Sequence, residues 1–170
     1  MLHRRCAIPI AVVAIVIATI LAFAPVSAAI SVGSKAPSFK VSTLDGKSMG
    51  LADLMGKPSV IVFWATWCPH CRNELPTIQK LHSDLTPKGV NFLGISLDTD
   101  AAAAKRLIGA DKITFANTIV SPSSDLAKSF GITGIPAVFI LDKEGVVKAK
   151  YAGEVSESTV RGELEKLGVK

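Results

Sequence analysis

Two cysteines separated by two residues follow directly on a run of β-branched and aromatic residues, and this junction constrains the fold most. The run covers Ser59 to Trp64, and the cysteines are Cys68 and Cys71. An amphipathic pattern continues to Leu85, so the pair belongs to the first turn of a helix that begins where a buried strand ends. Positions i and i+3 share a helix face, and one turn brings their Cα atoms within reach of a disulfide. The pair can open and close with little backbone movement, which suits a redox centre.

A structural staple and a zinc half-site are the simpler explanations of the pair, and both are weak. The bridge would close a loop of only four residues, which chain entropy credits with about 2 kcal/mol. A zinc site needs a second pair of Cys or His ligands, but Cys6 and His3 stand in the N-terminal leader and His82 stands alone. We therefore expect a redox-active Cys68–Cys71 disulfide, with no metal and no other cofactor.

The N-terminal leader differs in composition from the rest of the chain. The pair Arg4-Arg5 precedes an apolar stretch from Ile8 to Ala24, and Val26-Ser27-Ala28 fits a small-residue cleavage site. We predict a signal peptide over residues 1–28, with an uncleaved membrane anchor as the alternative, and one domain over residues 29–170. In both cases the domain is exported to the periplasm or a similar extracytoplasmic compartment, where disulfides form.

The charge pattern argues against nucleic acid as a partner. The formal net charge is +5 for the 170 residues, and it falls to +3 when Arg4 and Arg5 leave with the leader. The remaining charges alternate in sign, with no basic block and no interleaving of aromatic and basic residues. No internal repeat is present, and we expect a monomer.

The domain alternates predicted strands and helices. Strands are expected at Phe39–Thr43, Lys47–Met49, Ser59–Trp64, Val90–Leu97, Thr114–Val120, Ala137–Leu141 and Val146–Ala152. Helices are expected at Leu51–Met55, Cys71–Leu85, Ala101–Ile108, Ser124–Phe130 and Ser156–Leu167. Residues 98–100 are expected to cap the third of these helices. Turn signals join the first two and the last two strands as hairpins. This order predicts an α/β fold, a mixed central sheet with helices on both faces.

With its motif, this arrangement resembles the thioredoxin fold, and more narrowly the exported bacterial thiol–disulfide oxidoreductases of the TlpA/ResA type. The residues that carry the resemblance are Gly33–Phe39, Phe63–Pro76 and Gly131–Ile140. The segment around Thr114–Val120 fits the central insertion typical of that group, and the first hairpin is its N-terminal β-hairpin. The resemblance implies that Pro136 is a cis-proline packed against the disulfide; a trans proline that opens a strand is the alternative.

The resemblance and the residues themselves together indicate roles around the cysteines. Ile135 would present its backbone to an incoming peptide, and Trp67 would form part of the substrate surface. Cys68 is expected to attack, because a helix N-terminus favours the thiolate, and Cys71 to resolve the mixed disulfide. Glu74 matches a glutamate of ResA-like proteins and is a candidate for handling the Cys71 proton; its alternative role is only to complement the helix N-terminus.

The residues between the cysteines leave the direction of electron flow open. Pro69 fixes φ in the first turn, and His70 is expected to act electrostatically on Cys68, with an exposed spacer as the alternative. Pro69-His70 departs from the TlpA/ResA type and matches the strongly oxidising DsbA type. We favour reduction of disulfides in exported cysteine-containing proteins, as in cytochrome c biogenesis, with electrons from a membrane carrier of the thiol–disulfide interchange type.

Other functions of the same cysteines are open to test. The chain could instead donate disulfides to secreted proteins, or it could be a non-enzymatic copper or haem chaperone, since thiolates suit Cu(I). Antioxidant activity of the peroxiredoxin type is not expected. That family needs Thr three residues and Pro seven residues before its cysteine, where this chain has Ala65 and Ile61.

Overall fold

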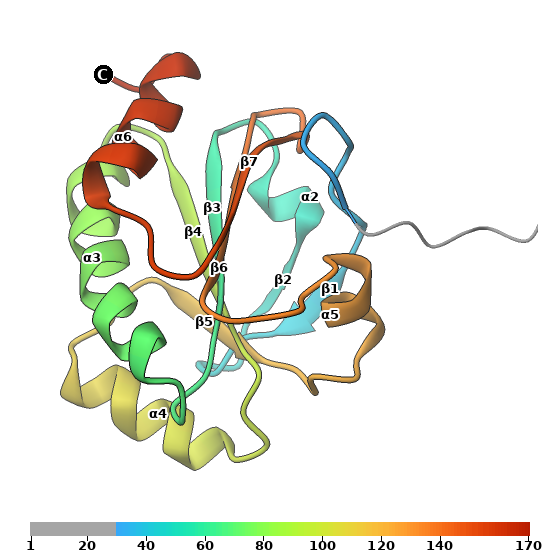
Figure 1. Cartoon of the computed structure of the whole chain (residues 1–170), viewed down its shortest axis with the longest axis vertical. Helices are drawn as coiled ribbons and strands as arrows, with labels where there is room; N and C mark the ends of the chain where they lie inside the picture. The colour runs from blue at the N-terminus through green and yellow to red at the C-terminus, as the bar shows by residue number, and fades with distance from the viewer. Residues whose placement is uncertain (1–29) are drawn as a thin grey trace, which may run out of the picture.

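A five-stranded mixed sheet forms the centre of the computed structural model, which describes residues 30–170 (Figure 1). The strand order is β5-β4-β3-β6-β7. Its strands are β3 (Ser59–Trp64), β4 (Asn91–Ser96), β5 (Ala116–Ile119), β6 (Ala137–Leu141) and β7 (Val147–Ala152). β3, β4 and β5 are parallel, whereas β6 pairs antiparallel with both β3 and β7. The central place of β3 explains why its sequence is apolar without alternation.

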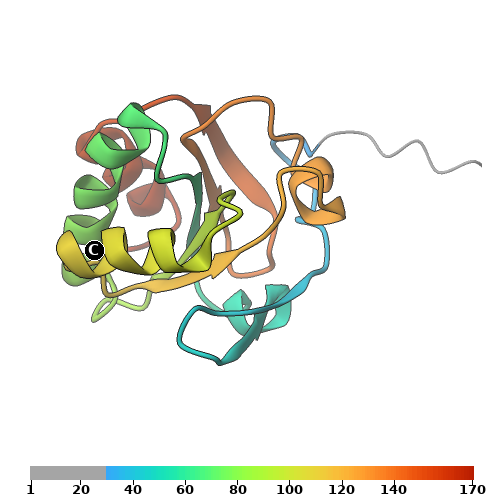
Figure 2. The ribbon, with the colours of Figure 1, turned by 90° about the horizontal axis from the view of Figure 1, so that it is seen from below.

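Helices cover both faces of this sheet. α3 (Pro69–Leu85), α4 (Ala101–Ala110) and α6 (Glu157–Lys166) lie on one side. α2 (Leu51–Leu54) and α5 (Asp125–Ser129) lie on the other side with the separate hairpin of β1 (Lys40–Ser42) and β2 (Ser48–Gly50) (Figure 2). A bridge between Thr43 and Thr118 ties this hairpin to the edge strand β5.

Successive residues of β3 build two separate cores, because side chains alternate across a strand. Val60, Val62 and Trp64 pack into the cluster beneath α3 and α6. Ile61 and Phe63 pack into the opposite cluster, where the ring centroids of Phe63 lie 5.1 Å from Phe130 and 5.8 Å from Phe139. The redox helix α3 is thus held on a strand that is buried on both faces.

The predicted α/β architecture is confirmed, including the N-terminal hairpin and the central insertion, which forms the edge strand β5. Most element ends agree with the prediction within two residues. α3 begins at Pro69 rather than at Cys71, because Cys68 serves as its N-cap. The predicted signal peptide lies outside the described residues. None of the helices between residues 30 and 170 combines the length and the apolar character needed to cross a bilayer.

Candidate active site

Cys68 and Cys71 form a disulfide at the N-terminus of α3, with their Cα atoms 5.3 Å apart. Cys68 is the N-cap residue, and its Sγ accepts a hydrogen bond from the Cys71 backbone N–H at 3.2 Å. Pro69 occupies the first turn, where a helix has no partner for an N–H. Both cysteines are buried, Cys71 completely. The sequence therefore predicted this geometry, and the helix places Cys68 nearer the surface than Cys71.

The segment before β6 reaches the disulfide from across the sheet. The Ile135–Pro136 peptide bond is cis, as the resemblance implied. The carbonyl oxygen of Ile135 lies 3.6 Å from Cys68 Sγ. Trp67, next to Cys68 in the chain, has 66% of its surface exposed. These residues surround the more accessible sulfur, and their role in binding substrate stays a prediction.

Glu74 is a buried carboxylate one turn along α3 from Cys71. Its side chain is only 2% exposed. Oε2 accepts a hydrogen bond from the Val155 backbone N–H at 3.1 Å, whereas Oε1 has no partner among the described residues. Burial raises the pKa of Glu74, the nearby Glu154 charge raises this pKa further, and the Val155 hydrogen bond opposes the change. Glu74 therefore holds a proton more readily than an exposed glutamate does, as a group that exchanges protons with a thiol requires.

His70 points to an acidic partner that the sequence analysis did not identify. Its exposed imidazole Nδ1 lies 2.6 Å from Oε1 of Glu154, in the loop between β7 and α6. Asn73 Nδ2 donates to the same oxygen at 3.3 Å. These hydrogen bonds lower the pKa of Glu154, the contact with His70 most strongly. Glu154 lies 84 residues from His70 in the chain and belongs to no motif, so only the fold could reveal this pair.

Asp98, at the end of β4, holds the segment that leads to Cys68. Its carboxylate accepts hydrogen bonds from the Thr66 backbone N–H at 3.0 Å, from the Thr66 hydroxyl at 2.7 Å and from the Ser96 hydroxyl at 2.7 Å. The helix cap predicted over residues 98–100 is Asp100 alone, which accepts from the Ala102 N–H. The position of Asp98 at the carboxyl end of a strand beside β3 is the signal that could have identified it.

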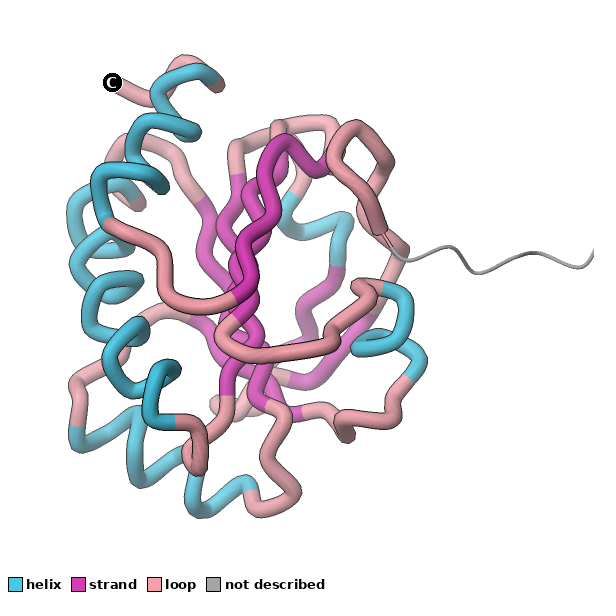
Figure 3. Tube along the Cα trace, viewed as in Figure 1, coloured by secondary structure: helices cyan, strands magenta, loops and turns pink. Residues whose placement is uncertain are grey.

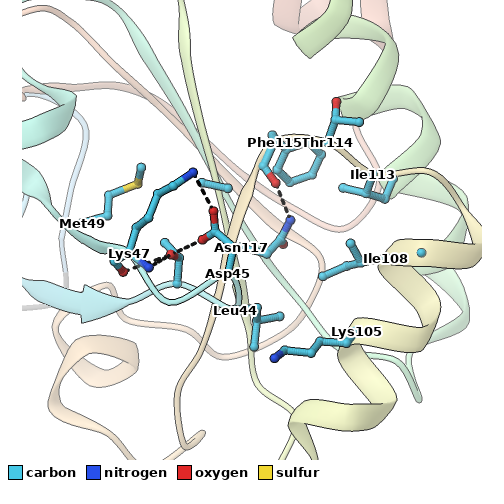
Figure 4. Close-up of a pocket in the computed structure, with 13 residues that line it drawn as sticks. Leu44, Asp45, Lys47, Met49, Lys105, Ile108, Ile113, Thr114, Phe115 and Asn117 are labelled. Carbon is cyan, nitrogen blue, oxygen red and sulfur yellow. Dashed lines mark hydrogen bonds and ion pairs between the residues drawn. The ribbon is translucent and has the colours of Figure 1, made fainter.

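A side chain of β5 makes a second contact with β3, beside the hollow shown in Figure 4. The hollow has a volume of about 550 Å³ and lies between the β1–β2 turn, α4 and β5. Asn117 in its wall accepts a hydrogen bond from Trp64 Nε1 at 3.0 Å and donates to the Phe115 carbonyl at 2.9 Å. Gly94 of β4 pairs with Asn117, and only a glycine fits there, because a Cβ would lie 1.9 Å from Asn117 Oδ1. Asn117 thus fixes the fully buried Trp64 in the core.

Within residues 30–170 no group of three or more His, Cys, Asp or Glu side chains is arranged to hold a metal ion. The chemistry that the described site supports is that of its two sulfurs. A disulfide at a helix N-terminus, the Ile135 carbonyl of a cis X–Pro bond beside the outer sulfur and a buried carboxyl one turn after Cys71 define a thiol–disulfide oxidoreductase with a thioredoxin-like fold.

Comparison with known proteins supports this class. Residues 31–166 match the Redoxin family model, and the chain belongs to that family. It is 30% identical to the thiol-disulfide oxidoreductase ResA of Bacillus thuringiensis (strain Al Hakam) over 136 residues, which cover 80% of this chain and 78% of the relative. It is 36% identical to the thiol:disulfide interchange protein DsbE of Pseudomonas fluorescens biotype C, covering 78% and 73% of the two chains.

A solved structure agrees with the fold. The thioredoxin domain of a thiol-disulfide oxidoreductase from Bacteroides vulgatus superimposes with a TM-score of 0.73 at 28% identity, and the match covers 84% of this chain and all of that domain. The protein is therefore a thiol–disulfide oxidoreductase.

Proposed function

We propose that the protein reduces disulfides in exported cysteine-containing proteins, as in cytochrome c maturation, and that a membrane electron carrier of the thiol–disulfide interchange type restores its dithiol. The resemblance to ResA and DsbE supports this role, and so does a leader typical of export. The redox-active groups are Cys68 and Cys71, with no metal or organic cofactor. The domain works as a monomer outside the cytoplasm, held there by the exported or anchored leader.

The observation that favours reduction over oxidation of the substrate is the set of groups around Cys68 Sγ. Its contacts within hydrogen-bond range, among the described residues, are the Cys71 N–H at 3.2 Å and the Ile135 carbonyl oxygen at 3.6 Å. In the reduced form the first contact would favour a thiolate and the second would disfavour it, and no cationic side chain within residues 30–170 bonds to this sulfur. A strong oxidant needs a strongly stabilised Cys68 thiolate in its reduced form. These surroundings fit a reductant better.

The reaction proceeds through a mixed disulfide. The Cys68 thiolate attacks one sulfur of the substrate disulfide, which breaks the substrate S–S bond and releases its other sulfur as a thiolate that takes a proton. Glu74 then accepts the proton of the Cys71 thiol, and the Cys71 sulfur attacks Cys68. The second substrate sulfur leaves and is protonated. Two electrons pass to the substrate, and the Cys68–Cys71 disulfide forms.

The direct test is the reduction potential of the pair, measured by equilibration with glutathione buffers. We expect a value near the ~−270 mV of thioredoxin. A value near the ~−120 mV of DsbA would contradict reduction and indicate a donor of disulfides. Cys71→Ser supplies the second arm, because its remaining Cys68 should retain substrate proteins as mixed disulfides that a reductant releases. Cys68→Ser is the matched control and should retain none.

A further inference from the structure

The loop after β7 contacts three parts of the redox site through three consecutive residues. The Gly153 N–H donates to the Pro136 carbonyl at 2.8 Å. The Glu154 carboxylate pairs with His70, and the Val155 N–H donates to Glu74. Figure 3 shows this loop crossing from the sheet to the layer formed by α3 and α6. The loop therefore holds His70, Glu74 and the cis-proline segment in fixed positions relative to one another.

Glu154 is the charged residue of this loop, and its carboxylate contacts α3. Its Oε1 receives both His70 Nδ1 and Asn73 Nδ2, so two side chains of α3 hold the carboxylate in place. Neither ring nitrogen of His70 bonds to the sulfur of Cys68 or Cys71, although Cys71 directly follows it in the chain. The ring nitrogen Nδ1 is already occupied by Glu154.

We infer that Glu154 is a positioning residue that sets the redox potential of the Cys68–Cys71 pair by holding the His70 ring through its Nδ1 and keeping that ring from facing the Cys68 thiolate. The inference deepens the proposed function and rests on it, because it explains how a DsbA-like spacer serves a reductant. An imidazolium free to face Cys68 would stabilise the thiolate and make the protein a stronger oxidant. The carboxylate counters that charge and also repels the thiolate directly.

Other charged side chains of α3 and α6 have their own surroundings or partners, whereas Glu154 is bonded to His70. On α3, Arg72 lines a hollow that it shares with Arg106 of α4. On α6, Glu157 is occupied by Lys80 at 2.8 Å and by Arg161 at 2.7 Å. Glu74, also on α3, is buried and accepts a hydrogen bond from Val155 of the same loop.

The experiment compares the full chain with Glu154→Gln, His70→Ala and the double variant. For each, the ionisation of the Cys68 thiol is followed by thiolate absorbance from about pH 4 to pH 9, and the equilibrium with glutathione is measured. Glu154→Gln should stabilise the thiolate about two- to fivefold, the range of exposed ion pairs. The equilibrium with glutathione should move by the same factor toward the dithiol, and fivefold corresponds to about 20 mV at ~30 mV per decade.

The double variant distinguishes positioning from a general effect of charge. In the His70→Ala background, Glu154→Gln should lose most of its effect, since only direct repulsion of the thiolate remains. Glu165→Gln, an exposed carboxylate elsewhere on α6, is the matched control and should leave both readouts unchanged. Equal shifts with and without His70, a shift toward a more reducing potential, or no shift at all would overturn the inference. The potential of the unaltered chain tests the proposed function separately.

Discussion

The ionised form of Glu74 destabilises the folded protein, because the hydrogen bond from Val155 only partly offsets the free energy needed to bury its charge. Its pKa is raised by burial, so the folded protein binds the Glu74 proton more tightly than the unfolded chain does. The stabilisation that this provides is complete below the unfolded pKa of about 4.3, and it is lost as pH rises through the higher folded value. The free energy of unfolding of Glu74→Gln, relative to the unaltered protein, should therefore rise with pH across this window.

The same substitution should slow catalysis, because Gln cannot accept the Cys71 proton. We expect the resolution of a mixed disulfide to slow by about 10²-fold, the lower end of general acid–base effects, with little change in the attack by Cys68. Stopped-flow reduction of a disulfide peptide separates the two steps, and urea unfolding over a pH series measures stability. Glu165→Gln should change neither quantity. A pH-independent stability difference would show that Glu74 ionises in the fold as it does in water.

Trp67 exposes a large aromatic surface beside the buried sulfur, at 66% of its area. If it binds the substrate polypeptide, Trp67→Ala should reduce kcat/KM for a protein disulfide about fivefold or more, as loss of an aromatic anchor does at an interface. A small disulfide has no polypeptide to contact and should react at the original rate. Met55→Ala removes another exposed apolar side chain, 42% exposed, which precedes β3 whereas Trp67 follows it, and serves as the control. Equal losses on both substrates would rule out a docking role.

Asp98 and Asp100 illustrate how one element holds another in position. Asp98→Ala would leave the buried Ser96 hydroxyl and the Thr66 N–H without their acceptor, and we expect a loss of about 2–4 kcal/mol at roughly 1–3 kcal/mol per unsatisfied group. Asp100→Ala removes only a helix N-cap and should cost about 1 kcal/mol. Urea unfolding of the two variants gives the comparison. Similar losses would mean that Asp98 contributes no more than a cap.

The elements were predictable from sequence to the extent that local chemistry determines them. β3 is apolar from Val60 to Trp64 because it is central, and Ser124 and Ser156, predicted as the first residues of their helices, are the N-caps of α5 and α6. Asp98 was predicted as a cap because a carboxylate next to a helix start suits that role, and its position at the carboxyl end of β4 was the only signal of its other role. Its partner Thr66 lies 32 residues away, and only the parallel pairing of β3 with β4 brings the two together.

At the scale of the molecule, the sequence identified the redox pair and its cis-proline because both belong to a contiguous motif or a recognisable resemblance. The groups that modulate the pair come from elsewhere. Glu154 and Val155 reach α3 only because β7 leaves the sheet beside it, and Asn117 reaches Trp64 only across the gap at Gly94. Such contacts depend on tertiary packing, which periodicity and spacing do not encode.

The redox state of the whole molecule should be coupled to its stability. Folding, unfolding, oxidation and reduction form a thermodynamic cycle, so a folded pair that is more reducing than the same pair in the unfolded chain must have the more stable oxidised form. The closed loop has only four residues, and chain entropy gives it at most about 2 kcal/mol. We expect the oxidised protein to be more stable than the reduced protein by about 1–2 kcal/mol, or roughly 1 M in the urea midpoint.

Unfolding of the oxidised protein and of the protein in excess dithiothreitol measures this difference. The double variant Cys68→Ser/Cys71→Ser should show no effect of the reductant, which excludes an action on the rest of the fold. The reverse order, with the reduced form more stable, is what a strongly stabilised Cys68 thiolate would produce. It would place the protein among disulfide donors, because in that case folding itself favours the dithiol, and the protein would release its disulfide to secreted thiols.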